Sequence, residues 1–230
     1  VVIAGGTDLG LGITKSHKSF PHLLHVGRLP ELQGVERTAT AIRIGAATPL
    51  EDVYEALRGL WPSLDQLWAR FASPPIRHAA TLGGKIANGS PIGDSMPALM
   101  ALDAELELAT SGATRCVALC DFYTGYRRSQ LQPGELIVAI HVPAPRSDQH
   151  YRVRKVAKRF DQDISSVCVA LNATLNDGVI DEVGETQVLF GHAGEQALTD
   201  AALVVADGGD ALLGQSLGQQ AIGRGADGRR

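Results

Sequence analysis

Cysteine is scarce in this 230-residue chain, and its spacing argues against one class of redox centre. The three cysteines are Cys116, Cys120 and Cys168, and no pair of them has CxxC spacing. Iron–sulfur clusters usually need four thiolates. The chain is therefore expected to hold no cluster of its own. Few, unclustered thiols also suit a reducing, cytoplasmic compartment, with each thiol packed as a small apolar group.

Long apolar runs and an excess of basic charge are missing as well. No stretch of about 18 apolar residues occurs, although 44% of the residues are hydrophobic, so no membrane span is expected. The formal net charge is -4, which argues against a nucleic-acid surface. The chain begins without Met inside the apolar run 1–4 and shows no signal peptide. We expect it to be a segment of a longer protein.

The common cofactor and catalytic signatures are absent from the sequence. Neither GxGxxG before a long helix nor GxxxxGK[ST] occurs, which argues against a Rossmann dinucleotide domain and a P-loop nucleotidase. The histidines do not cluster, so no metal site is indicated. No pattern supports a Ser-His-Asp triad or a pair of catalytic carboxylates.

Short periodic segments predict an α+β protein whose helices and strands do not alternate regularly. A helix is expected from Pro49 to Arg58 with Thr48 as its N-cap, and a second one from 62 to 71, stopped by 73–75. Residues 81–94 are rich in Gly, Ser, Asn and Pro and predict a loop. The other expected elements are a short helix at 97–102 and strands at 1–4, 23–26, 41–44, 105–109, 115–119, 135–142, 151–157, 165–175 and 185–190.

The chain is expected to divide into two units and a tail. Two prolines in the stretch 143–149 mark the expected boundary. The first unit would then cover residues 1–145 and a smaller α+β unit residues 150–198. Residues 199–230 lose the periodic pattern and are expected to form a mobile tail.

Two glycine clusters, nearly eighty residues apart, are the most informative feature that is present. The first is Ala4-Gly5-Gly6-Thr7-Asp8, and the second runs from Thr81 to Asn88. A glycine pair lets bare backbone N–H groups approach a ligand closely, and successive N–H groups in a turn suit phosphate oxygens. Each cluster also has a threonine hydroxyl and an aspartate nearby. Together they predict a clamp around a diphosphate cofactor.

Seven motifs in series resemble the flavin domain of the molybdenum hydroxylases. They lie at residues 2–9, 76–84, 88–94, 97–102, 122–126, 133–137 and 158–165. The resemblance covers about residues 1–194 in the right order. Within the family, we expect the resemblance to be to the small (FAD/iron–sulfur) subunit of bacterial xanthine dehydrogenase.

This resemblance implies an FAD-binding fold of the vanillyl-alcohol-oxidase (PCMH) type for residues 1–145, followed by a C-terminal subdomain similar to that of the carbon monoxide dehydrogenase flavoprotein. It implies an electron-transfer module that binds FAD. Electrons from hypoxanthine or xanthine oxidation would arrive through iron–sulfur clusters and leave as hydride to NAD+. The implied partners are a large subunit with the molybdopterin cofactor and an iron–sulfur domain, with no nucleic acid and no membrane.

The resemblance also implies the residues that contact FAD. Gly5, Gly6 and the Thr7 hydroxyl would face the pyrophosphate, Asp94 would accept from ribose or ribityl hydroxyls, and Lys155 would tune the flavin potential. No side chain is expected to act as a catalytic residue beyond that. The full implied set is Val2, Ile3, Ala4, Gly5, Gly6, Thr7, Asp8, Leu9, Phe71, Thr81, Leu82, Gly83, Gly84, Lys85, Asp94, Ile137 and Lys155.

Each of these residues also has an ordinary structural alternative. Phe71 could be plain core packing, Asp94 a helix N-cap, and Lys155 a surface lysine. Lys85 stands where the family usually has Asn, so it could pair with a phosphate, crowd the loop, or simply reach solvent.

Two other functions stay open at this point. One is the flavin subunit of another molybdenum hydroxylase, of the carbon monoxide dehydrogenase or aromatic-acyl-CoA reductase type. The other is a truncated chain that folds in part and binds no flavin, which the abrupt start and Lys85 would favour.

Overall fold

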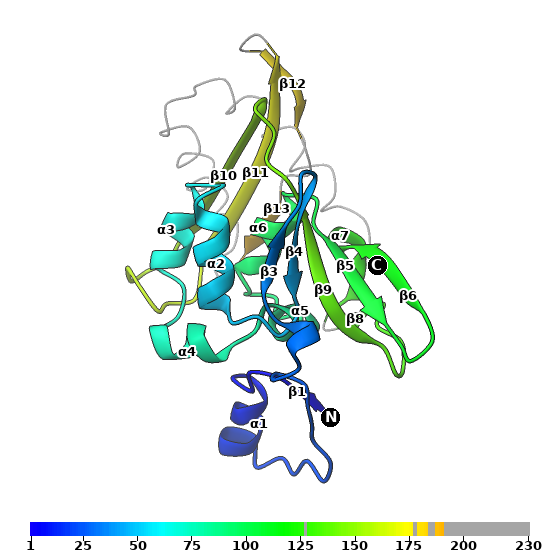
Figure 1. Cartoon of the computed structure of the whole chain (residues 1–230). Helices are drawn as coiled ribbons and strands as arrows, with labels where there is room; N and C mark the ends of the chain where they lie inside the picture. Colours follow the sequence, from blue (N-terminus) through cyan, green and yellow to red (C-terminus); the bar gives the residue numbers. More distant parts are fainter. Residues whose placement is uncertain (127, 177–178, 184–186, 191–230) are drawn as a thin grey trace, which may run out of the picture.

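The computed structural model describes residues 1–126, 128–176, 179–183 and 187–190, and its largest described sheet has five antiparallel strands (Figure 1). Their order is β3-β4-β9-β5-β6, so β9, the last of the five in the sequence, lies in the centre. The bounds are Val35–Arg37 for β3, Ala41–Gly45 for β4, Glu105–Ala109 for β5, Thr114–Ala118 for β6 and Leu136–Pro143 for β9.

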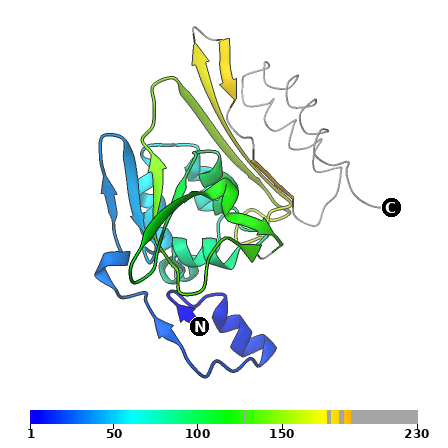
Figure 2. The same ribbon diagram turned by 90° about the vertical axis from the view of Figure 1, so that its right-hand side faces the viewer.

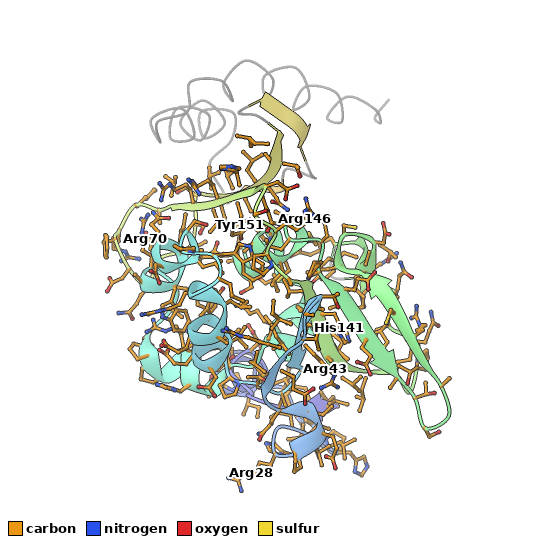
Figure 3. The ribbon with its side chains drawn as sticks, turned by 45° about the horizontal axis from the view of Figure 1, so that its top comes forward. Arg28, Arg43, Arg70, His141, Arg146 and Tyr151 are labelled. Atoms are coloured by element: carbon orange, nitrogen blue, oxygen red, sulfur yellow. The ribbon has the colours of Figure 1, made fainter. Side chains whose placement is uncertain are left out.

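The two faces of this sheet differ because successive side chains of a strand point to opposite sides. Ile44, Ile140 and Leu106 are register partners on the inner face, and each of them is fully buried. On the outer face, Arg43 and His141 are register partners and lie next to each other in Figure 3. The inner face therefore supplies core, and the outer face carries polar side chains at this register pair.

A second sheet is built around the long strand β11. Strand β10 pairs with one edge of β11, and β12 and β13 share the other edge. All three pairings are antiparallel. The bounds are Gln149–Val156 for β10, Val167–Asn176 for β11, Val179–Val183 for β12 and Gln187–Phe190 for β13.

Short helices lie between these two sheets (Figure 2). Helix α3 packs on β10, α6 on β11 and α5 on β9, so the helices connect the sheets. The bounds are Leu50–Arg58 for α2, Leu64–Ala69 for α3, Pro74–Ala79 for α4, Leu82–Asn88 for α5, Ser95–Met100 for α6 and Leu119–Phe122 for α7.

The N-terminal segment lies at the bottom of Figure 1, against the end of the helical layer. Its short strands β1 and β2 are parallel, and its helix α1 has no buried residue. A small hairpin, β7 with β8, lies after α7. The bounds are Val2–Ile3 for β1, Leu9–Ser16 for α1, Leu24–His25 for β2, Pro30–Leu32 for the 3-10 turn η1, Tyr123–Gly125 for β7 and Arg128–Ser129 for β8.

Several expected elements occur close to their expected places. The helix expected from Pro49 is α2, the strands expected at 105–109 and 115–119 are β5 and β6, and the strand expected at 135–142 is β9. The expected mixture of helices and strands is confirmed. The tail expected at 199–230 lies outside the described residues, as does the part of the expected second unit that follows residue 190.

Two expectations are wrong, and one helix was not expected. Residues 82–88 form helix α5 rather than a loop, because Thr81 caps the helix and Gly83 packs closely on the sheet. The helix that was not expected is α4: α3 ends before residues 73–75, as expected, but the prolines at 74–75 also begin a new helix, since proline is tolerated in a first turn. Thr48 is not the N-cap of α2, because its hydroxyl donates to the carbonyl of Gly34 at 3.1 Å.

The expected packing of the cysteines is correct for only one of the three. Cys168 is buried, whereas Cys116 and Cys120 are exposed. Cys116 is opposite Glu107 on an edge strand, where its side chain has solvent on one side. Two thiols therefore lie at the surface instead of in the core.

The core runs without a break across the expected boundary at 143–149. Tyr151 and Val153 of β10 and Ala170 of β11 belong to the same buried cluster as Ile44 and Leu106. Figure 3 shows Tyr151 beneath β10, at the centre of the molecule. Among the described residues, no helix is long and apolar enough to cross a membrane.

Candidate functional site

The first glycine cluster forms a tight loop between β1 and α1. Gly6 has a φ of 71°, a left-handed conformation that glycine adopts without strain. In the part of the chain that the structure describes, no acceptor pairs with the backbone N–H groups of the four successive residues Gly5 to Asp8. Successive N–H groups in such a turn form a concavity that suits anions. The loop therefore offers donors to an anionic ligand.

Gly5 brings this loop against the second glycine cluster. A Cβ atom at Gly5 would overlap the carbonyl oxygen of Ala79 and would lie 2.9 Å from the Cα atom of Ala80. Ala80 directly precedes Thr81, where the second cluster begins. The two clusters, far apart in sequence, are thus neighbours in space, as the clamp prediction requires. The absence of a side chain at Gly5 therefore allows close contact with the backbone of Ala79 and Ala80.

The second cluster is the first turn of α5, and its donors are used within the chain. The Thr81 hydroxyl accepts the backbone N–H of Gly84 at 3.3 Å, as an N-cap. The backbone N–H of Gly83 donates to the carbonyl of Ala46 at 2.8 Å. A Cβ atom at Gly83 would lie 2.5 Å from the Cβ atom of Ala46. Gly83 therefore allows the helix to pack on the end of β4.

Phe71 and Lys85, both predicted to contact the cofactor, lie together. The Lys85 ammonium is 5.3 Å from the centroid of the Phe71 ring, a cation–π contact. The Phe71 ring is buried and lies 6.1 Å, centroid to centroid, from the ring of Tyr54. The Lys85 side chain is partly buried, and its ammonium pairs with no acidic side chain among the described residues. The second cluster thus carries a cation on an aromatic ring.

Asp94 and Lys155, two further predicted site residues, form a buried ion pair. The Lys155 ammonium donates to Asp94 Oδ2 at 2.7 Å, and each side chain is 3% exposed. The Ser165 hydroxyl donates to Asp94 Oδ1 at 2.5 Å. Asp94 occupies the N-cap position of α6, but its carboxylate makes no capping hydrogen bond. Both carboxylate oxygens are therefore satisfied by β10 and by the segment before β11.

Neutral groups surround this pair. Burial raises the pKa of the Tyr54 hydroxyl, although a hydrogen bond to Ser95 at 3.0 Å opposes the shift. Burial, together with the charge of Asp94, raises the pKa of the Cys168 thiol. Burial also raises the pKa of Tyr151, whose hydroxyl donates to the carbonyl of Ala98 at 3.0 Å. Two of these groups, the Tyr54 hydroxyl and the Cys168 thiol, feel the charge of Asp94, and their raised pKa values keep them neutral.

The remaining predicted residues are divided between the core and the surface. Leu82 and Ile137 are buried in the central cluster, whereas Val2 is exposed. The residues from Ile3 to Thr7 and Leu9 are partly buried. The structure thus brings the glycine clusters together and pairs Phe71 with Lys85 and Asp94 with Lys155. Contact of each with a cofactor stays a prediction.

The sequence reasoning assigned no role to Ser165 or Arg77. Ser165 completes the hydrogen bonding of Asp94, from 71 positions away in the chain. The Arg77 guanidinium donates to Glu51 at 2.8 Å and to the carbonyl of Phe71 at 3.0 Å. Both residues lie inside motifs that carried the family resemblance. That placement was the available signal, but it did not show what they contact.

No metal centre is evident at the site. Within the described ranges, no group of three or more His, Cys, Asp or Glu side chains is placed to hold a metal ion. The one histidine that pairs with a carboxylate in those ranges is His141, 2.9 Å from Glu107 on the outer face of the large sheet. It lies away from the glycine clusters, on the other side of that sheet.

Comparisons with known proteins agree on one family. Residues 1–145 match the family described as the FAD binding domain in molybdopterin dehydrogenase. Xanthine dehydrogenase of Drosophila pseudoobscura pseudoobscura is 36% identical over 187 residues, which are 74% of this chain and 14% of that protein. The xanthine dehydrogenase FAD-binding subunit of Escherichia coli O157:H7 is 32% identical over 198 residues, which cover 84% of this chain and 66% of the subunit.

Solved structures show the same likeness. A chain of the reconstituted CO dehydrogenase from Oligotropha carboxidovorans has a TM-score of 0.73 at 28% identity and covers 82% of this chain and 66% of that one. A chain of a Cu,Mo-CO dehydrogenase has a TM-score of 0.72 at 29% identity, with coverage of 90% and 78%. These likenesses confirm the predicted fold class. This chain is a member of the family of FAD-binding domains of molybdopterin dehydrogenases.

Proposed function

We propose that this chain binds FAD between its two glycine clusters and serves as the electron-transfer module of a xanthine dehydrogenase. The observation that carries the proposal is the run of four backbone N–H groups from Gly5 to Asp8 that find no acceptor among the described residues, next to the start of α5. A diphosphate has the acceptor oxygens that these donors lack. The donors present therefore fit the cofactor.

Three groups of residues in the chain would have separate roles in binding FAD. The N–H groups of Gly5 to Asp8 and the Thr7 hydroxyl would hold the pyrophosphate. The Phe71 ring, with Lys85 over it, would offer an aromatic ring and a cation at the second glycine cluster. Lys155 and Asp94, which already hold each other, would act on the flavin through the field of their ion pair.

The bound flavin would accept electrons from iron–sulfur clusters and pass them as hydride to NAD+ while a molybdenum-cofactor subunit oxidises hypoxanthine or xanthine. Two similarities support the purine substrate: the xanthine dehydrogenase of Drosophila and the FAD-binding subunit of Escherichia coli. The likeness to CO dehydrogenase chains favours a second candidate, the flavin module of another molybdenum hydroxylase. In both cases the substrate is chosen outside this chain.

The proposal is tested by the visible absorbance of the purified chain after FAD is added and free FAD is removed by desalting. Wild-type protein should retain flavin bands, and NADH should then bleach them. Gly6→Val should lose the flavin, because a β-branched residue is strained at a φ of 71° and would distort the donor loop.

Gly134→Val is the matched control. Gly134 has a φ of 85° and open space around it, in the turn before β9, so the substitution adds similar strain away from the clusters. It should retain the flavin. Flavin retained by Gly6→Val at the wild-type ratio would contradict the role of the loop, and no flavin on the wild-type chain would contradict the function itself.

A further inference from the structure

Arg77 ties three short helices to the turn that carries Phe71. Its Nε donates to Glu51 Oε2 of α2 at 2.8 Å, and the guanidinium carbon lies 4.1 Å from the centroid of the Trp68 ring of α3. Its Nη1 donates to the carbonyl of Phe71 at 3.0 Å and to that of Ala72 at 3.4 Å. The side chain is 13% exposed. One planar group thus satisfies a carboxylate, two carbonyls and an aromatic face.

The turn that Arg77 holds is strained. Ala72 has a φ of 47°, in the left-handed region that costs a residue with a Cβ atom about 1–2 kcal/mol. Such a conformation persists only where the surroundings impose it. Arg77 donates to the carbonyl of Ala72 itself and to that of the preceding residue, Phe71. These bonds fix the direction in which the chain leaves α3.

Phe71 immediately precedes the strained residue, so the turn sets where its ring lies. That ring receives the Lys85 ammonium on one side and packs near Tyr54. We infer that Arg77 is a positioning residue for the flavin site: it holds the Phe71 ring in the place where the ring meets Lys85 and the cofactor. This inference rests on the proposed function, because it assigns Arg77 a part in flavin affinity.

Lysine could not replace arginine in this role. A lysine ammonium is a compact point charge, whereas the guanidinium fork bonds Glu51 and the two carbonyls at once and stacks on Trp68. Arg77→Lys keeps the charge and a pairing with Glu51 but releases the carbonyls of Phe71 and Ala72. It therefore separates charge pairing from positioning.

The experiment compares the whole chain with Arg77→Lys and with a control, Arg115→Lys. Arg115 also makes two bonds to a carboxylate, that of Glu135 at 2.7 and 2.8 Å, and one to a backbone carbonyl, that of Gln130, but on strand β6. The first readout is the Kd for FAD, with the visible circular dichroism of the bound flavin. The second is the NMR shift of the Lys85 ε-methylene protons, which the Phe71 ring current moves upfield and which needs no flavin.

Arg77→Lys should raise the Kd for FAD about tenfold, change the flavin dichroism and remove the upfield shift of Lys85. Arg115→Lys should change none of the three. If the Arg77→Lys variant kept the Kd and the flavin dichroism of the wild-type chain, the inference about Arg77 would be overturned, and the proposed function would stand. A wild-type chain that binds no FAD would overturn the proposed function, and the inference with it.

A second variant covers the case in which Arg77→Lys does not fold. Glu51→Gln leaves Arg77 in place and removes only the charge that orients it, so it should fold and shift all three readouts in the same direction, with a Kd raised about threefold. Unchanged readouts in folded Glu51→Gln would then overturn the inference.

Discussion

The loop at Gly5–Asp8 and the pair Asp94–Lys155 were both predicted to contact the cofactor, yet they are in opposite states. Within the described ranges, the loop leaves four successive backbone donors unpaired, whereas both carboxylate oxygens of Asp94 are bonded within the chain. Unpaired N–H groups at a partly exposed loop are free to donate hydrogen bonds to a ligand. A satisfied, buried pair mainly holds the fold, and it would reach a ligand through its electric field.

The largest expected effect comes from breaking the buried ion pair of Asp94 and Lys155. Lys155→Met leaves the Asp94 carboxylate buried without its counter-charge and should lower the free energy of unfolding by about 3–5 kcal/mol. Urea denaturation measures the change. Lys158→Met, at an exposed lysine of the same segment, should cost less than about 0.5 kcal/mol. Adding Asp94→Leu to Lys155→Met should recover most of the loss, and a single variant as stable as wild type would show that the pair is not closed in solution.

The next effect concerns how the open loop is held. Gly5→Ala should cost about 3 kcal/mol, because the new methyl group would overlap the backbone carbonyl of Ala79. Gly10→Ala, in helix α1 with nothing within 4 Å of its Cβ position, should instead gain about 0.5–1 kcal/mol from helix propensity. Thermal unfolding of both variants gives the comparison. Equal effects at the two positions would mean that the loop does not pack on Ala79.

A smaller effect tests whether the second glycine cluster is a helix in solution. Thr81→Ala removes the side-chain oxygen that accepts the N–H of Gly84 and should cost about 1 kcal/mol. Thr81→Ser keeps an oxygen in the same place and should stay close to wild type. Hydrogen exchange at Gly84 would rise in the alanine variant alone. If the two variants behaved alike, residues 82–88 would be a loop in solution, as their composition suggests, and not a helix.

The smallest effect comes from an ion pair outside both regions, which serves as a reference. Hydrogen bonds from Arg115, with the backbone N–H of Gln132, lower the pKa of Glu135 from 4.5 to about 2. A lowered carboxylate pKa stabilises the fold above the unfolded-state pKa, and that stability is lost as the pH falls through the folded-state value. Unfolding measured between pH 4.5 and 2 should therefore depend less on pH in Glu135→Gln. An unchanged slope would show that the pair is open in solution.

The sequence pattern predicted those helices and strands that depend on residues near one another in the chain. The α2 helix and the hairpin of β5 and β6 follow from periodicity and turn residues near in sequence. Helix α5 could not be predicted that way, because two glycines lower helix propensity by about 1 kcal/mol each. What outweighs this cost is the packing of Gly83 on Ala46, a contact between distant segments.

At the site too, the features set by nearby residues could be predicted, and the contacts between distant segments could not. The glycine clusters were visible as motifs, and their adjacency was a reasonable expectation. The partner of Asp94 was not, since Lys155 is 61 positions further on and charge alone does not distinguish it from neighbouring Arg152 or Lys158. Position along the chain decides the matter: Lys155 is buried on β10, whereas Arg152 of the same strand and Lys158 beyond its end are exposed.

The unbroken core has a consequence for how the chain gains and loses its structure. Tyr151 and Val153 fill the same cluster as Leu106, and Lys155 neutralises Asp94 across the stretch 143–149. Neither side of that stretch buries its apolar surface or its charge alone. Melting is therefore a single cooperative event, and a polypeptide cut at this stretch would regain its fold only when the two pieces associate, as a split protein whose halves report on each other's presence.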